Sequence, residues 1–215
     1  MKIVSLNVGL PSAQLYQAQQ VITGGAKQPV SRAVLRFENF DGDRQADLLN
    51  HGGLEKAVCV YPFDHYPYWS RWLGRDLKPG AFSENLTVCG AIETEVCVGD
   101  VFRIGEALVQ VSQPRMPCAK LAGKNGSKGL PKLMAEVGYT GFYMRVLSEG
   151  VVAAGDRFDL ERAHPDGITI ADVNGIIYEK SCDVALIGRL AELPEFSKVG
   201  RALFARRLER LVSRG

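Results

Sequence analysis

The sequence lacks the long apolar runs that mark membrane proteins and secreted precursors. No apolar stretch approaches the about 20 residues that a membrane-spanning helix requires. The first residues, MKIVSL, are typical of a strand, and they lack the apolar core and small-residue cleavage site of a signal peptide. We therefore expect a cytoplasmic protein with no membrane partner.

Several catalytic fingerprints are missing as well. The chain has three histidines and no Gly-x-Ser-x-Gly sequence, so a serine hydrolase is poorly supported. It has no Walker loop and no Gly-x-Gly-x-x-Gly sequence, so nothing indicates a site for NAD or flavin. Its five cysteines include no Cys-x-x-Cys pair, which argues against a zinc site of the usual spacing and against an iron–sulfur cluster.

A large excess of charge is also absent. The formal net charge of +2 gives no global reason to expect a nucleic-acid partner. The basic segment 198–215 has apolar residues at helical spacing, so we interpret it as an amphipathic helix with a solvated cationic face. The 215 residues are 46% hydrophobic, which is ordinary for a soluble globular chain of one large domain or one domain with an appendage.

What the chain does contain is a series of short strands separated by glycine turns. The segments that alternate or are rich in β-forming residues are 2–8, 15–22, 57–61, 86–89, 101–104, 108–112, 142–147 and 151–154. A hairpin is expected to turn at Gly105-Glu106, and helices are expected only near 63–73 and 130–137. This pattern predicts a mixed, mainly β fold, with a β-barrel or a highly curved sheet.

The composition changes near His164-Pro165-Asp166-Gly167, after which the chain is helical. Thr169 is a candidate cap for a helix over 170–178, and two more helices are predicted over 183–191 and 198–214. We therefore expect a β domain over residues 1–163 and a small C-terminal three-helix segment over residues 168–213.

The most informative segment is residues 113–121, QPRMPCAKL, which places one cysteine next to two prolines and two cations. Pro114 and Pro117 are expected to hold a defined, non-helical loop. Positive charge from Arg115 and Lys120 lowers a thiol pKa and favours the thiolate, which binds metals and attacks electrophiles. From local sequence alone, Cys118 can be a functional thiolate or a buried small hydrophobe, and both interpretations stay open.

The other four cysteines carry less information. Cys59, Cys89 and Cys97 lie in or beside apolar strand-like runs and are expected to be buried thiols. Cys182 begins a helix-like segment with no visible chemistry.

A second polar region, His51-Gly52-Gly53 and Lys56, is a candidate ligand-binding site. Glycines let the backbone approach a ligand closely and expose its amides, although a glycine turn capped by histidine explains the same residues. Asn85, at a strand entry, could bond either a turn or a ligand. Cys118 and His51 could also form the thiol–imidazole pair of a cysteine-nucleophile enzyme.

Taken in order, these segments resemble a known family. The motifs are HGG and KAV within 51–58, FSENLTVCG at 82–90, VGD at 98–100, PRMPC at 114–118, GFYMRV at 141–146, and Gly150 with Gly155-Asp156. The chain is similar to MOSC domains, the molybdenum-cofactor-sulfurase C-terminal type, with core motifs over about 28–160. Its DLLNHGG (47–53), YPFDHY (61–66) and TIADVN (169–174) stretches resemble the YiiM-like branch, which carries a C-terminal three-helix appendage.

The resemblance implies a β-barrel-like core and a site for the molybdenum cofactor, molybdopterin. Cys118 matches the loop cysteine that supplies a thiolate to molybdenum and is thus the implied metal ligand and catalytic residue. Asn85 matches the family's asparagine, and Glu84 beside it is either a proton relay or an exposed turn carboxylate. The remaining candidates would bind the cofactor's phosphate through cations or backbone amides: Arg115, Lys120, Arg145, Lys56, Arg32, His51, Gly52 and Gly53.

The implied activity is reduction of N-hydroxylated nucleobase analogues or related N-oxygenated compounds, which amounts to N-hydroxylaminopurine detoxification. Electrons would come from a separate reductase, because the chain lacks its own NAD, flavin or iron–sulfur fingerprint. A homodimer is compatible with the C-terminal helices, which could otherwise bind a redox partner or cover apolar surface. Pyridoxal phosphate binding is implied only for the family as a whole. The alternatives are a non-enzymatic carrier of molybdenum cofactor or of cysteine-bound sulfur, and a cysteine-nucleophile enzyme.

Overall fold

A curved eight-stranded sheet forms the centre of the protein. The computed structural model describes residues 1–16 and 18–213, with all their side chains except those of residues 49, 50 and 212. The strand order is β12-β8-β9-β10-β6-β7-β1-β4. These strands are β1 (Lys2–Val8), β4 (Gln28–Val30), β6 (Val58–Pro62), β7 (Leu86–Cys89), β8 (Val101–Ile104), β9 (Ala107–Pro114), β10 (Phe142–Ser148) and β12 (Phe158–Arg162).

The sheet curls so that strands far apart in its order meet again. Ile3 of β1 exchanges backbone hydrogen bonds of 2.9 Å with Asp156 and Gly155, just before β12, although β12 and β1 lie near opposite ends of the strand order. A second ladder joins β5 (Arg32–Leu35) to β11 (Gly150–Ala153). The expected barrel-like, mixed fold is therefore confirmed, and only the β6–β7 pair in the main sheet is parallel.

The interior of this sheet is apolar because inward positions alternate with outward ones. In β1, Ile3 is fully buried between the exposed Lys2 and Val4, and a register shift between Ile3 and Ser5 brings Leu6 inward as well. The β8–β9 hairpin turns at Gly105-Glu106 as expected, with Gly105 at φ 55.

One predicted strand is wrong. Residues 15–22 form not a single strand but a hairpin of β2 (Ser12–Tyr16) and β3 (Gln19–Thr23), in which Leu15 pairs with Gln20. Its turn contains Ala18 at φ 65. The turn escaped the sequence analysis because neither glycine nor proline, the usual residues at such positions, marks it.

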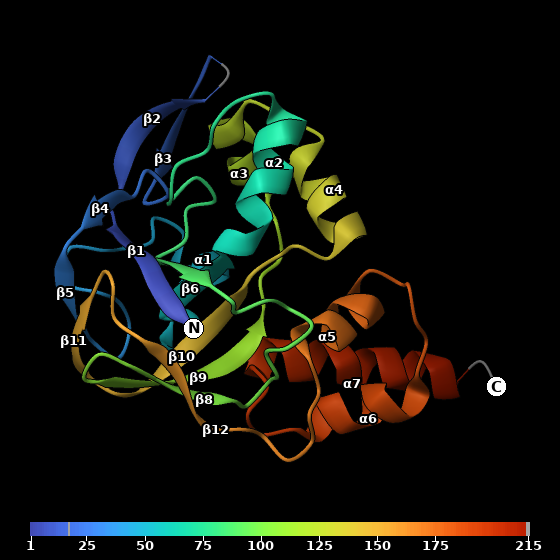
Figure 1. Cartoon of the computed structure of the whole chain (residues 1–215). Helices are drawn as coiled ribbons and strands as arrows, with labels where there is room; N and C mark the ends of the chain where they lie inside the picture. Colours follow the sequence, from blue (N-terminus) through green and yellow to red (C-terminus); the bar gives the residue numbers. More distant parts are fainter. Residues whose placement is uncertain (17, 214–215) are drawn as a thin grey trace.

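The helices fall into two groups, which Figure 1 shows at different sides of the sheet. The first group lies beside the β2–β3 hairpin and comprises α2 (Tyr66–Leu73), α3 (Ala119–Asn125) and α4 (Leu130–Val137); α1 (Leu48–His51) and the 3-10 turns Leu54–Lys56 and Phe63–His65 are short connections. A separate apolar cluster around Trp69, Phe82 and Leu121 packs this group against β6. Helix α3 was not anticipated, since Pro117 and two glycines obscure it in the sequence.

The second group is C-terminal: α5 (Ile170–Ile177), α6 (Val184–Glu192) and α7 (Lys198–Val212), close to the predicted ranges. Thr169 caps α5 in a capping box with Asp172, as the sequence suggested. Apolar residues of these helices belong to the same buried cluster as the sheet, so at least part of their role is to cover its apolar surface. Among the described residues, no helix combines the length and apolar character needed to cross a membrane.

Candidate functional site

Cys118 stands where a central strand turns into a helix. β9 ends at Pro114 and α3 begins at Ala119, so only residues 115–118 form the connection. Cys118 is the extended N-cap residue of α3, with φ −125 and ψ 168. The two prolines on either side of Arg115 thus occupy the end of a strand and the approach to a helix, where a rigid φ and a missing donor are tolerated.

The surroundings of Cys118 favour its thiolate. Burial raises the pKa of the thiol, but hydrogen bonds from His51 and from the Leu121 backbone N–H, together with the charge of Arg115, outweigh it and lower the pKa to about 7. The position at a helix N-terminus acts in the same direction. Of the two interpretations of Cys118 from local sequence, the structure favours the reactive thiolate.

Arg115 is a buried cation beside this thiol. Its side chain is among the buried polar groups at 6% exposure, and its backbone N–H donates to the Gly141 carbonyl at 3.0 Å. The guanidinium lies near Cys59, Tyr143 and Cys118, and its Nη1 atom has no hydrogen-bond partner. A buried guanidinium is always charged, so this unpaired donor is suited to an anion in the adjoining space.

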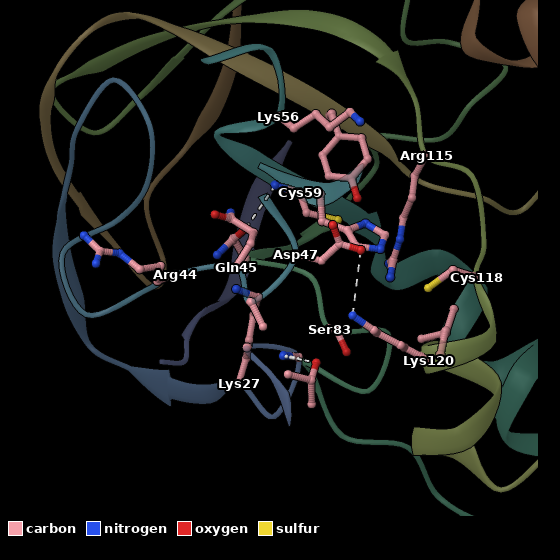
Figure 2. Close-up of a pocket in the computed structure, with 18 of the residues that line it drawn as sticks. Lys27, Arg44, Gln45, Asp47, Lys56, Cys59, Ser83, Arg115, Cys118 and Lys120 are labelled. Carbon is pink, nitrogen blue, oxygen red and sulfur yellow. Dashed lines mark hydrogen bonds and ion pairs between the residues drawn. The ribbon is translucent and has the colours of Figure 1, made fainter. Parts of the chain in front are cut away.

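That space is a cleft of about 690 Å³, part of which is open to solvent. Figure 2 shows Arg115 with Cys59 and Cys118 on either side of it. The charged side chains of the lining are Lys27, Arg44, Lys56, Arg115 and Lys120, with one carboxylate, Asp47. Since cations outnumber carboxylates, the cleft is suited to an anionic ligand.

Six of the residues predicted from the sequence meet at this cleft: Cys118, Arg115, Lys120, His51, Lys56 and Asn85. Lys120 forms an ion pair with Asp47 at 3.9 Å. Burial lowers the pKa of Lys56, while Glu55 and Asp47 raise it. These six come from α1, the turn before β6, the entry of β7 and the β9–α3 connection, which are distant in sequence.

The structure does not bring the other two predicted cations to the lining. Arg145 pairs with Glu55 at 3.4 Å and donates to Gln110 at 3.1 Å. Arg32 is exposed on β5, opposite Ala153 of β11. Arg145 shares a face of β10 with the lining residue Tyr143 but lies two residues further along the strand, where it pairs with Glu55. Arg32 lies on β5, none of whose residues lines the cleft.

Gly52 and Gly53 also lie outside the lining, next to His51, which belongs to it. Gly53 has φ 93 and ψ 163, a conformation that essentially only glycine adopts. The glycines therefore allow the chain to turn sharply between α1 and the 3-10 turn that holds Lys56.

Glu84 is not the exposed turn carboxylate that was one of its two expected roles. It is fully buried, not exposed in a turn, and it does not line the cleft. Its carboxylate accepts bonds from the backbone N–H groups of Gly80 (2.8 Å) and Phe82 (3.0 Å), from the Thr87 hydroxyl (2.6 Å), and from the Tyr66 hydroxyl. This carboxylate organises the loop that presents Ser83 and Asn85.

We expect Glu84→Gln to destabilise the protein. The amide NH2 cannot accept the hydrogen bonds that one carboxylate oxygen accepts, so buried donors lose their partners, at a cost of about 2–4 kcal/mol. Thermal unfolding of E84Q, compared with the exposed control Glu38→Gln, measures this. Equal melting temperatures for the two variants would show that the loop does not depend on the carboxylate.

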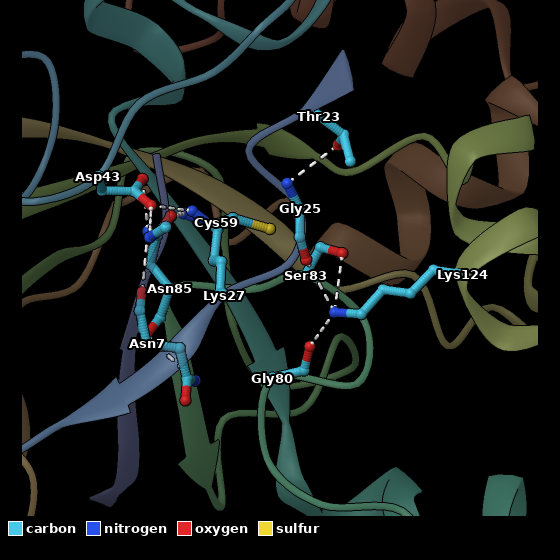
Figure 3. Close-up of polar contacts among 11 residues, drawn as sticks. Asn7, Thr23, Gly25, Lys27, Asp43, Cys59, Gly80, Ser83, Asn85 and Lys124 are labelled. Atoms are coloured by element: carbon cyan, nitrogen blue, oxygen red, sulfur yellow. Dashed lines mark hydrogen bonds and ion pairs between the residues drawn. The ribbon is translucent and has the colours of Figure 1, made fainter. Parts of the chain in front are cut away.

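Asn85 lines the cleft, but its polar atoms are already used. Its Oδ1 accepts from the Cys59 N–H at 3.1 Å, and its Nδ2 donates to Asp43 at 2.9 Å. Asp43 in turn pairs with Lys27 and accepts from the Gly9 N–H at 2.8 Å (Figure 3). Asn85 therefore links β6 to the Asp43–Lys27 pair and fixes the floor of the cleft.

The sequence analysis missed several lining residues. Lys27 follows the glycine pair Gly24-Gly25, which could have indicated a close approach of the backbone to a ligand. Arg44 lies in the polar segment before His51, and that polarity could have indicated a binding loop. Tyr143, on β10, had no such signal. Its contribution depends on strand pairing, which places it opposite Cys59 and Gln113.

The expected burial of the other cysteines is partly wrong. Cys59 is buried as predicted, yet it lines the cleft. Cys89 is exposed because it ends β7, near Asp64, and Cys97 is half-buried in the loop before β8. Within the described part of the chain, no group of three or more His, Cys, Asp or Glu side chains could hold a metal ion by itself.

Comparison with known proteins agrees with this fold. A model of the MOSC domain matches residues 47–159, and a model of the YiiM-like, 3-alpha helix domain matches residues 168–211. The chain is 47% identical to YflK of Bacillus subtilis (strain 168) over 98% of this chain and 96% of that protein. The crystal structure of YiiM from Geobacillus stearothermophilus superposes with a TM-score of 0.82 at 38% identity, covering 96% and 98% of the two chains.

A third similar protein carries a functional name. A protein named Reductase from Gibberella moniliformis (strain M3125 / FGSC 7600) is 34% identical over 71% of this chain, but the match spans 28% of that protein. The chain belongs to the MOSC domain family, in its YiiM-like branch with the C-terminal three-helix domain.

Proposed function

We propose that this protein is a molybdenum-cofactor-dependent reductase of N-hydroxylated nucleobase analogues, such as N-hydroxylaminopurine, or of related N-oxygenated compounds. The observation that carries the proposal is the presence, in one cleft, of a thiol whose pKa is lowered to about 7 and of a buried arginine whose Nη1 has no hydrogen-bond partner. The family is associated with this cofactor, and the reductase name of one relative supports the reaction class.

The donor set of the cleft fits such a cofactor. Molybdopterin brings its own sulfur ligands, so one protein thiolate, Cys118, is sufficient to attach the metal. Its phosphate requires cations, and Arg115 offers an unpaired Nη1 while Lys27, Arg44, Lys56 and Lys120 add positive charge. Bound there, the cofactor would supply two-electron redox chemistry.

The chain's own residues prepare the site for that chemistry. His51 and the Leu121 N–H favour the ionised form of Cys118 by hydrogen bonding to the sulfur. Asn85 fixes β6 and the Asp43–Lys27 pair, which sets the floor of the cleft. Reduction of an N-hydroxyl group consumes two electrons and two protons and releases water. We infer that a separate reductase protein delivers the electrons, since the chain has no NAD, flavin or iron–sulfur fingerprint.

Metal content tests the proposal. Protein purified from a host that makes the cofactor is expected to carry about one molybdenum per chain, since one thiolate offers one attachment point. Cys118→Ser should lose nearly all of it, whereas the exposed Cys182→Ser should keep it. Unchanged molybdenum in C118S, or none in the wild type, would contradict ligation by Cys118.

Turnover then separates an enzyme from a carrier. With a reduced dye as electron donor, molybdenum-loaded protein should convert N-hydroxylaminopurine to the amine. Full molybdenum occupancy without turnover would favour a carrier of cofactor, or of sulfur as a Cys118 persulfide.

A second candidate is a cysteine-nucleophile enzyme, which the hydrogen bond between His51 and Cys118 favours. In that case metal-free protein would be active, and alkylation of Cys118 would abolish the activity. Activity that requires molybdenum excludes this candidate.

A further inference from the structure

Lys124 connects the helix that begins at Cys118 to two loops across the cleft. It lies in the last turn of α3, whose N-cap is Cys118. Its ammonium donates to three neutral oxygens, the Gly25 carbonyl at 2.8 Å, the Gly80 carbonyl at 2.5 Å and the Ser83 hydroxyl at 3.2 Å (Figure 3). Gly25 and Ser83 line the cleft, whereas Lys124 itself does not.

The loop that contains Gly25 and the loop over residues 80–83 are in close contact where Lys124 donates hydrogen bonds to both. A Cβ atom on Gly25 would lie 2.9 Å from the Ser83 hydroxyl oxygen. Ser83 has φ 60, a left-handed conformation that is costly for a residue other than glycine. This arrangement is therefore strained, and it persists only because the surrounding contacts maintain it.

We propose that Lys124 is a positioning residue, which holds the cleft wall formed by Gly25 and Ser83 in place against the helix that begins at Cys118. Without the N–H donors of Lys124, of which the neutral amine keeps two, these oxygens would lose their partner and the wall would move away from the helix. The inference requires the cleft to be the functional site, but it does not depend on which cofactor or substrate binds there.

A pH dependence follows, with a definite sign. Burial lowers the pKa of Lys124 to about 8; Glu84 raises it, and Arg115 and Lys27 lower it further. When the wall opens, Lys124 enters water and its pKa returns toward 10.5. The open form thus binds the proton more tightly, so protonation favours opening and a rise in pH from 7 to 9 favours the closed wall, by about tenfold in the opening equilibrium.

Hydrogen exchange of the purified full-length chain tests this. In the wild type, the protection factors of amides in segments 23–28 and 79–85 should rise about tenfold between pH 7 and pH 9, after correction for intrinsic exchange. Lys124→Met should have lower protection in both segments at pH 7 and no such rise. It should also react several-fold faster with iodoacetamide at Cys118. The exposed Lys128→Met should behave as the wild type.

Two results would overturn the inference. One is that amide protection of segments 23–28 and 79–85 in the wild type stays level or falls between pH 7 and pH 9. This result contradicts the inference even if K124M does not fold. The other is a K124M variant that keeps the wild-type profile. Amides of β10 serve as the internal reference for global stability. Failure of the wild type to bind molybdenum would reject the proposed function and leave this result intact.

Discussion

Replacing Arg115 with methionine is expected to weaken anion binding in the cleft by about 30-fold or more without destabilising the fold. The loss corresponds to at least about 2 kcal/mol, the lower range for removing one partner of a buried charge-assisted contact. Stability should change little, because the cost of burying the Arg115 cation, whose Nη1 has no partner, is offset by its attraction to Cys59, Tyr143 and Cys118. Methionine of similar length removes the cost of burying that charge.

The measurement is a titration of the purified protein with inorganic phosphate, together with its melting temperature. Arg145→Met is the matched control, since Arg145 is a half-buried arginine paired with Glu55 outside the cleft. It should show the opposite pattern, with a lower melting temperature and unchanged phosphate affinity. Phosphate binding that survives in R115M, or that is lost in R145M, would place the anion elsewhere.

Alkylation of Cys118 by iodoacetamide is expected to follow a titration centred near pH 7, and His51→Ala is expected to move its midpoint to higher pH. The thiolate is the reactive form, so the rate rises as pH passes through the pKa of Cys118, which is lowered to about 7. Without the hydrogen bond from His51, the pKa moves toward the ordinary thiol value of about 8.5. The thiolate fraction at pH 7 then falls from about one half to less than roughly one tenth.

Mass spectrometry of the peptide that contains Cys118 follows this reaction without interference from the exposed Cys89 and Cys182. His164→Ala is the control, because His164 pairs with Glu195 at 3.6 Å and does not line the cleft. The same midpoint in H51A and the wild type would mean that His51 does not set the ionisation of Cys118. Arg115→Met should also raise the midpoint, since its charge acts on the same sulfur.

Much of the fold could be predicted where the signal is local. The β8–β9 hairpin needs only a glycine turn between two alternating runs, and α4 and the C-terminal helices follow from apolar spacing and caps such as Thr169. The prediction of residues 15–22 as one strand was wrong because a turn at Ala18, without glycine or proline, has no local signal. The order of the motifs along the chain indicated the MOSC family, and that resemblance implied a functional role for Cys118.

The sequence by itself determined that Cys118 is rigidly presented beside cations, because prolines and charges act over a few residues. Only the tertiary structure decided which cations share its cleft. It brought Lys27 and Arg44 to the lining, left Arg32 and Arg145 outside, and buried Glu84 behind the loop it organises. The physical reason is that side-chain convergence depends on strand order, register and sheet curvature. These arise from long-range pairing, such as that of β1 with β7 and of β9 with β10, which no local pattern encodes.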